Sequence, residues 1–156
     1  QCHGSAAQGA KGFPNLTDEE WQWGGEPETS KTTILGGRIA MMPPFGPSLG
    51  GEGVKDVANY VRSLSGMAHD SLRAQRGAEL FQQNCVACHG ADAKGGPAMG
   101  APNLTNKIWL YGSDEAALVE TITNGRAGVM PAWVGRLDPA TVKALTVFVH
   151  SLGGGK

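Results

Sequence analysis

The stretch Asn84-Cys85-Val86-Ala87-Cys88-His89-Gly90 carries the spacing that decides the fold of this chain. In a CxxCH sequence, the two cysteine thiols bond covalently to the vinyl groups of a haem, and the histidine that follows binds its iron. This five-residue pattern rarely arises by chance in a chain of 156 residues. The motif predicts a haem c held by Cys85 and Cys88, with His89 as one iron ligand.

The first residues, Gln1-Cys2-His3-Gly4, have the form of a second such motif without its first cysteine. This accounts for the odd number of cysteines, since the chain has three and two of them complete the motif at 85–89. A disulfide framework or a zinc site of the CxxC type would need further cysteines that the sequence lacks. We predict a second haem c, attached through Cys2 alone, with His3 on its iron.

An internal repeat organises most of the chain. A shift of 88 residues superposes the PNLT segment at 14–17 on that at 102–105, and Met42-Pro43 on Met130-Pro131, without a gap. The haem motifs are offset by 86 residues, so the second copy has two extra residues in its glycine-rich loop. Self-similarity at a fixed spacing indicates a duplicated unit. Each unit is small enough for a covalent cofactor to supply much of its core.

Hydrophobic periodicity predicts helices, and no alternating strand pattern is evident, so the expected fold class is all-α. Asp70 is the expected N-cap of one helix, and Pro139 follows Asp138 at the first position of another. The buried stripe of that last helix should consist of Val142, Leu145, Val149 and Leu152. Helices are expected at about 29–35, 54–64, 71–84, 113–124 and 139–152.

An iron that passes electrons without binding gases or peroxide needs a second protein ligand, and a methionine thioether suits the reduced ion. Met42 and Met130 are the candidates, because each precedes a proline that restricts the backbone. Met41 is the rival of Met42, but the repeat aligns Met42 with Met130. Met67 and Met99 have no counterpart in the other copy and are interpreted as packing or loop residues.

Within each unit, the expected ligand pairs are His3 with Met42 and His89 with Met130. The other two histidines, His69 and His150, are interpreted as surface residues.

Four pairs of residues related by the repeat are expected around the haem groups. A backbone carbonyl would accept the ring N–H of the motif histidine, and a leucine would pack on the haem face. An arginine and an indole N–H would bind propionates, although an exposed arginine and a core tryptophan are alternative interpretations. The pairs are Pro14 and Pro102, Leu16 and Leu104, Arg38 and Arg126, and Trp21 and Trp109.

The net charge of −1 and the absence of a Lys/Arg stripe argue against a nucleic-acid partner. The longest apolar runs fall far short of the ~20 residues that cross a bilayer. Because haem c is attached outside the cytoplasm in bacteria, we expect a periplasmic location.

A group of acidic residues would either steer a basic donor or form a solvated loop. These residues are Asp18, Glu19, Glu20, Glu26 and Glu28.

Together these motifs resemble class I c-type cytochromes. The order QCHGSAAQGAKGFPNLTDEEW, GGEPET, YVRSLSG, NCVACHG, MGAPNLTNKIWLYGS and MPAW is similar, over nearly the whole chain, to the diheme subunit III (CcoP type) of cbb3-type cytochrome c oxidases. The resemblance implies two tandem class I cytochrome c domains, at 1–66 and 67–156, each wrapped around a covalently bound haem c.

That resemblance also implies a function. The two haem c groups would relay electrons from a periplasmic cytochrome c donor to the oxygen-reducing catalytic subunit, in a complex with a monohaem subunit. The chain would be a soluble domain at the periplasmic face of the bacterial inner membrane, with a membrane segment outside this sequence and no catalytic site of its own. One alternative is a free diheme shuttle cytochrome. Another is a diheme peroxidase, against which the matching Met42 and Met130 argue.

Overall fold

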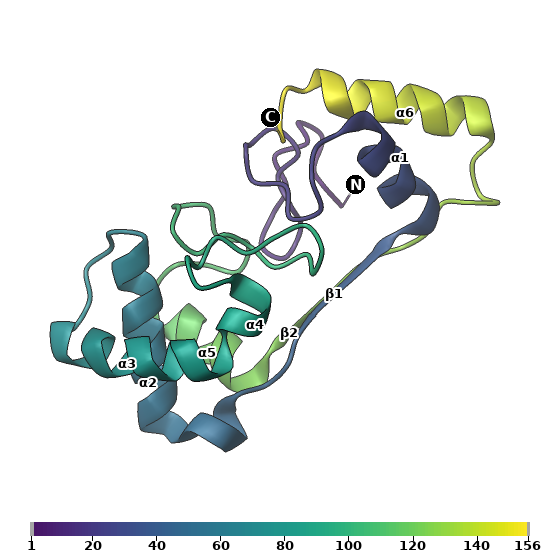
Figure 1. Cartoon of the computed structure of the whole chain (residues 1–156). Helices are drawn as coiled ribbons and strands as arrows, with labels where there is room; N and C mark the ends of the chain where they lie inside the picture. The colour runs from purple at the N-terminus through teal and green to yellow at the C-terminus, as the bar shows by residue number, and fades with distance from the viewer. Residues whose placement is uncertain (1, 156) are drawn as a thin grey trace.

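The computed structural model describes residues 2–155, which form two lobes joined by a two-stranded antiparallel ribbon (Figure 1). The elements in chain order are α1 (Pro27–Gly36), β1 (Arg38–Met42), α2 (Gly46–Leu64), α3 (Ser71–Asn84), α4 (Val86–His89), α5 (Glu115–Asn124), β2 (Arg126–Met130) and α6 (Pro139–Ser151).

The predicted helices are present, and their ends follow the local sequence. The Asp70 carboxylate accepts hydrogen bonds from the N–H groups of Leu72 and Arg73 at the start of α3. Asp114 and Asp138 cap α5 and α6 in the same way. Helix α2 begins earlier than predicted, because its first turns precede a kink at Gly50, where φ is 65°.

The expectation of an all-α chain is wrong for the ribbon. β1 and β2 pair antiparallel, with Arg38 opposite Met130 and Met42 opposite Arg126. The outer face of this ribbon carries apolar side chains, with Ile39 68% and Met41 74% exposed. Because both faces carry apolar residues, hydropathy does not alternate along the strands and gives no period-2 signal.

Each lobe combines helices from both sequence repeats. Lobe A contains residues 2–25, α1 and α6, and lobe B contains α2, α3, α4, α5 and the loop 90–112 (Figure 1). β1 leads from α1 to α2 and β2 leads from α5 to α6, so the chain crosses between lobes on each strand.

Two hydrogen bonds related by the repeat show that the exchange is reciprocal. The Phe45 N–H donates to the carbonyl of Ile122 (2.9 Å), and the Trp133 N–H donates to the carbonyl of Ile34 (3.1 Å). The 88-residue shift relates Phe45 to Trp133 and Ile34 to Ile122. In each case the segment after one strand bonds to the helix that precedes the other strand.

The core of lobe B lies between α2, α3 and α5. It includes Val54, Val57 and Phe81, each 1% exposed, and the Tyr60 and Phe81 rings pack in a tilted arrangement with centroids 5.3 Å apart. Gly77 allows α3 to approach α2 closely, because a Cβ there would lie 2.0 Å from the Asp56 carbonyl oxygen. This packing holds the helix that leads into the haem motif.

The predicted buried stripe of α6 is only partly correct. Val142 is buried, but Leu145 is 37% exposed and Val149 and Leu152 are half-buried. Helix α6 packs on α1 through the face of Val142 and Thr146, which leaves the Leu145 side of the helix uncovered by α1.

Candidate haem-binding sites

Each motif histidine lies against the same backbone carbonyl in its repeat. His3 Nδ1 is 2.8 Å from the Pro14 oxygen, and His89 Nδ1 is 3.2 Å from the Pro102 oxygen. A carbonyl that accepts the Nδ1 proton fixes the ring and leaves Nε2 free to bind a metal. The chain therefore contains two histidines held ready for the same kind of ligation.

Burial keeps the His89 ring in the form that binds a metal. His89 is 9% exposed, and desolvation lowers its pKa below the usual value, while the hydrogen bond to Pro102 opposes this shift. The neutral imidazole is therefore favoured, which is the ligating form.

The cysteines of the complete motif lie around the single turn α4. Cys85 ends α3, its N–H donating to the Phe81 carbonyl, and is 8% exposed, whereas Cys88 is exposed. Burial raises the pKa of the Cys85 thiol to about 11. Cys2 is exposed in lobe A, next to His3.

The loop after each motif folds in the same way in both repeats. The Leu16 N–H donates to the Ala7 carbonyl and the Leu104 N–H to the Ala93 carbonyl, both at 2.8 Å. Ala7 and Ala93 both have positive φ, 58° and 57°, which is uncommon for alanine. Leu104 also packs against the core of lobe B. The duplicated loop thus brings a leucine and a proline carbonyl to equivalent places beside each histidine.

The duplicated tryptophans and one arginine supply unpaired donors that fit a haem. Nε1 of Trp21 and of Trp109 and Nη2 of Arg126 are buried and have no hydrogen-bond partner within residues 2–155. A buried donor without an acceptor is costly, and such groups commonly await a ligand or water. Haem propionates are carboxylates and would accept these hydrogen bonds.

Two aromatic residues that the sequence analysis missed hold the arginines. The guanidinium carbon of Arg38 lies 4.7 Å from the ring centroid of Trp23, and that of Arg126 lies 4.5 Å from the centroid of Tyr111. The Nε atoms of these arginines donate to the hydroxyls of Thr33 and Thr121, at 2.8 and 2.9 Å. The 88-residue shift also superposes Trp23 on Tyr111 and Thr33 on Thr121, so the repeat contained the signal.

The ribbon delivers the two candidate methionines to opposite lobes. Met42 packs against the core of lobe B. Its carbonyl oxygen lies close to Gly125, at the end of α5, because a Cβ on Gly125 would be 2.3 Å from that oxygen. Met130 lies opposite Arg38, just after α1, and approaches Gly37 in the same way. Met41 lies on the outer face and is 74% exposed.

The position of each methionine bears on the expected ligand pairs. The repeat pairs His3 with Met42 and His89 with Met130, which requires each repeat to fold on itself. The structure places Met42 in the lobe of His89, because β1 carries the chain out of lobe A before Met42 is reached.

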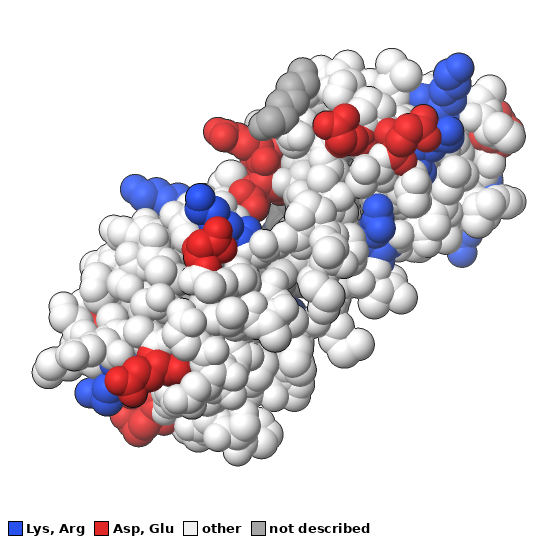
Figure 2. Space-filling model, viewed as in Figure 1, with Lys and Arg blue, Asp and Glu red and all other residues white. Residues whose placement is uncertain are grey.

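The acidic residues near the chain start are not all available to a partner. Glu20 binds the Asn106 side chain and the Asn103 N–H of the other repeat, and Glu28 pairs with Lys31 at 3.2 Å. Desolvation raises the pKa of Glu20. Figure 2 shows acidic and basic side chains interspersed on the visible face, and not in one large patch of either sign.

The sequence matches a family described as cytochrome c oxidase, cbb3-type, subunit III, over residues 1–61 and 72–149. It is 60% identical, over 99% of the chain, to the cbb3-type cytochrome c oxidase subunit FixP of Bradyrhizobium sp. strain ORS 278. It is also 46% identical, over 100% of the chain, to the cbb3-type cytochrome c oxidase subunit CcoP of Cereibacter sphaeroides.

The chain spans 57% and 58% of the lengths of these two relatives. Within residues 2–155, no helix combines the length and the apolar character that a bilayer crossing requires.

Proposed function

This chain belongs to the family of subunit III of cbb3-type cytochrome c oxidases, and from that premise we propose that it holds two haem c groups and relays electrons. The electrons would pass from a periplasmic cytochrome c donor to the oxygen-reducing catalytic subunit. The observation that carries this proposal is the duplicated site, with a motif histidine against a proline carbonyl in each lobe.

The proposed partners are drawn from the relatives, which are named as subunits of cbb3-type oxidases. The proposed location is drawn from the attachment of haem c outside the cytoplasm. We place the chain beside the catalytic and monohaem subunits, at the periplasmic face of the inner membrane. The sequence repeats 1–66 and 67–156 would each contribute one haem attachment motif.

The residues of the chain would bind and orient the cofactor. When bound, haem c supplies a one-electron iron couple whose potential depends on ligands, burial and hydrogen bonds. Cys85 and Cys88 would anchor one haem and Cys2 the other. The proline carbonyls would fix the histidine rings, and the unpaired donors of Trp21, Trp109 and Arg126 would bind propionates.

We also propose that the methionine ligands are crossed between the repeats, with Met42 serving the haem of His89 and Met130 that of His3. The packing of Met42 in lobe B and the position of Met130 beside α1 support this assignment. With a histidine and a methionine from the chain as ligands, each iron would have no open position for a substrate.

The crossed assignment can be tested in a chain that carries a single haem. With Cys85 and Cys88 both replaced by alanine, only the haem of Cys2 and His3 should attach. Met130→His should then remove the methionine-to-iron charge-transfer band and lower the midpoint potential by ~0.1 V or more, within the ~0.8 V that axial ligands span. Met42→His should leave both unchanged, and the opposite result would restore ligation within each repeat.

The relay itself is tested with the intact chain. The reduced protein should bind carbon monoxide poorly, turn over peroxide negligibly and exchange electrons rapidly with a small cytochrome c. Stoichiometric carbon monoxide binding to either haem would contradict the relay and favour the peroxidase alternative.

A further inference from the structure

The C-terminal helices of the two repeats, α2 and α6, are equivalent by the repeat, yet of these two helices α2 packs on α3 and α6 packs on α1. The repeat relates them position by position, since Tyr60-Val61-Arg62-Ser63-Leu64 of α2 corresponds to Phe148-Val149-His150-Ser151-Leu152 of α6. Each follows a methionine–proline pair. The choice of helix on α3 therefore decides which methionine enters the lobe of His89.

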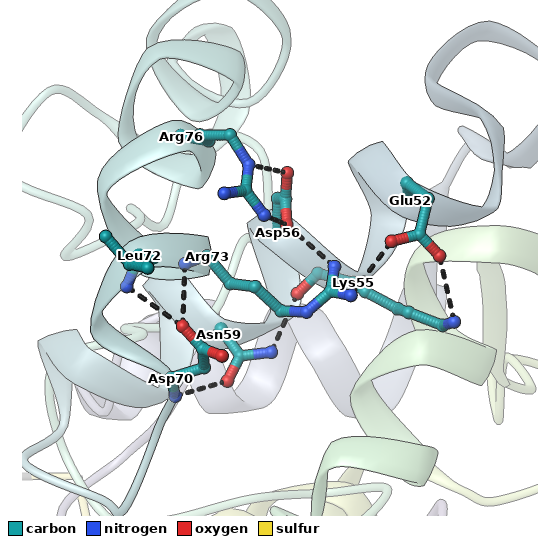
Figure 3. Close-up of polar contacts among 8 residues, drawn as sticks. All are labelled: Glu52, Lys55, Asp56, Asn59, Asp70, Leu72, Arg73 and Arg76. Carbon is teal, nitrogen blue, oxygen red and sulfur yellow. Dashed lines mark hydrogen bonds and ion pairs between the residues drawn. The ribbon is translucent and has the colours of Figure 1, made fainter.

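Helix α2 meets α3 through a polar face formed by Glu52, Asp56 and Asn59 (Figure 3). Asp56 is 6% exposed and accepts two hydrogen bonds from Arg76, at 2.7 and 2.9 Å. Arg73 bridges two members of this face, donating to Asp56 at 2.9 Å and to Glu52 at 2.8 Å. The bidentate geometry makes the Asp56–Arg76 contact specific as well as strong.

The amide of the polar face is equally well matched to α3. Asn59 is 1% exposed, and its oxygen accepts the N–H of Asp70, the N-cap residue of α3, at 2.9 Å. Its nitrogen donates to the Lys55 carbonyl at 2.9 Å. Without Asn59, the Asp70 N–H would lose its acceptor at the helix start.

Helix α6 lacks every member of this face. The 88-residue shift places Ala140, Ala144 and Val147 where α2 has Glu52, Asp56 and Asn59. Docked on α3, α6 would leave Arg73 and Arg76 without carboxylates, and an unpaired charge at an interface is penalised.

We infer that the polar face of α2 is the specificity determinant that selects α2 over α6 for α3, and so assigns Met42 to the haem of His89. The assignment of Met42 to that haem rests on the crossed ligation proposed above, whereas the helix selection does not. The selection combines attraction for α2 with rejection of α6, as in interfaces that discriminate between similar partners.

The direct test moves the polar face from one helix to the other. One chain carries E52A, D56A and N59V in α2 together with A140E, A144D and V147N in α6, and is loaded with haem. Nitroxide labels on Gln82→Cys of α3 and Lys143→Cys of α6 report helix pairing by pulsed electron paramagnetic resonance. We expect a new short-distance population that the parent and an E79Q control lack.

If the exchanged chain keeps the single long distance of the parent, the side chains do not select the helix, and the inference is overturned. In that case the short connection at 65–70 would decide the pairing. The distance measurement does not depend on which residues bind the iron. A negative result here therefore overturns only the helix selection, whereas the single-haem chains test the crossed ligation.

A double-mutant cycle keeps the inference falsifiable if the exchanged chain does not take up haem. D56N should increase the unfolding equilibrium constant of lobe B ~30-fold. This value lies between the effects of breaking an exposed and a buried ion pair, because Asp56 is buried and Arg76 is half exposed. D56N and R76Q together should show a coupling of at least ~10-fold. The E79Q control should change the constant by less than ~2-fold, and additive effects of D56N and R76Q would overturn the inference.

Discussion

Gly77→Ala should destabilise lobe B because it drives α3 away from α2. The added Cβ would lie 2.0 Å from the Asp56 carbonyl oxygen and 2.9 Å from Tyr60 Cβ. Reaching an ordinary contact requires the two helices to separate by about 1.4 Å, and both contact atoms are close to backbone and cannot swing aside. Such overpacking costs about 3 kcal/mol, from which the helix propensity of alanine recovers about 1 kcal/mol.

The net loss of about 2 kcal/mol corresponds to a fall in Tm of about 4–8 °C for a chain of this size. Thermal unfolding of the haem-loaded protein, followed by far-ultraviolet circular dichroism and by the methionine–iron band, measures it. Gly51→Ala is the matched control, since nothing lies within 4 Å of a Cβ at Gly51 on α2. That change should raise Tm slightly. A Gly77→Ala protein as stable as the parent would refute the close approach of α2 and α3.

Three further outcomes are expected. The hydrogen bonds from Arg76 hold the pKa of Asp56 below its usual value, so its contribution to stability is complete above pH ~4 and is lost as the pH falls through the lower folded-state pKa. Asp56→Asn should therefore reduce the difference in Tm between pH 6 and pH 3, and an unchanged difference would exclude Asp56 as a source. Arg126→Gln removes a positive charge beside the proposed propionates and should lower one midpoint potential by tens of millivolts, where 59 mV is a tenfold change for one electron; Lys143→Gln on the far lobe should change neither potential. Denaturing mass spectrometry should find two haem groups on the chain, one of them attached through Cys2, and a mass with a single haem would contradict the diheme proposal.

The local structure was readable from the sequence because it depends on short-range chemistry. Asp70 and Asp138 cap their helices, and the contact between each motif histidine and its proline carbonyl lies within one loop. The repeat supported the histidine contact twice, because the motif and its proline occur in both copies.

The path of the chain between the lobes could not be read in this way. Two copies of one sequence pattern can close on themselves or exchange helices, and most contacts within a lobe are alike in the two cases. On the inference above, the two cases differ in residues that the repeat does not share, such as Asp56 and Ala144. The contact of Asp56 with Arg76 of α3 is seen only in the folded chain. The ribbon was not predicted because its outward residues include the apolar Ile39 and Val129, so polar and apolar residues do not alternate along the strands in the usual way.

The double crossing of the ribbon makes the two lobes inseparable as units of folding. A cut in the connection between α2 and α3 would give two fragments that each hold one attachment motif, yet each fragment would keep a helix belonging to the other lobe. Residues 67–156 alone would present α3 without α2 and α6 without α1. Each lobe is therefore completed only when both halves of the chain are present, so a break in this connection should weaken the helix packing of both lobes at once.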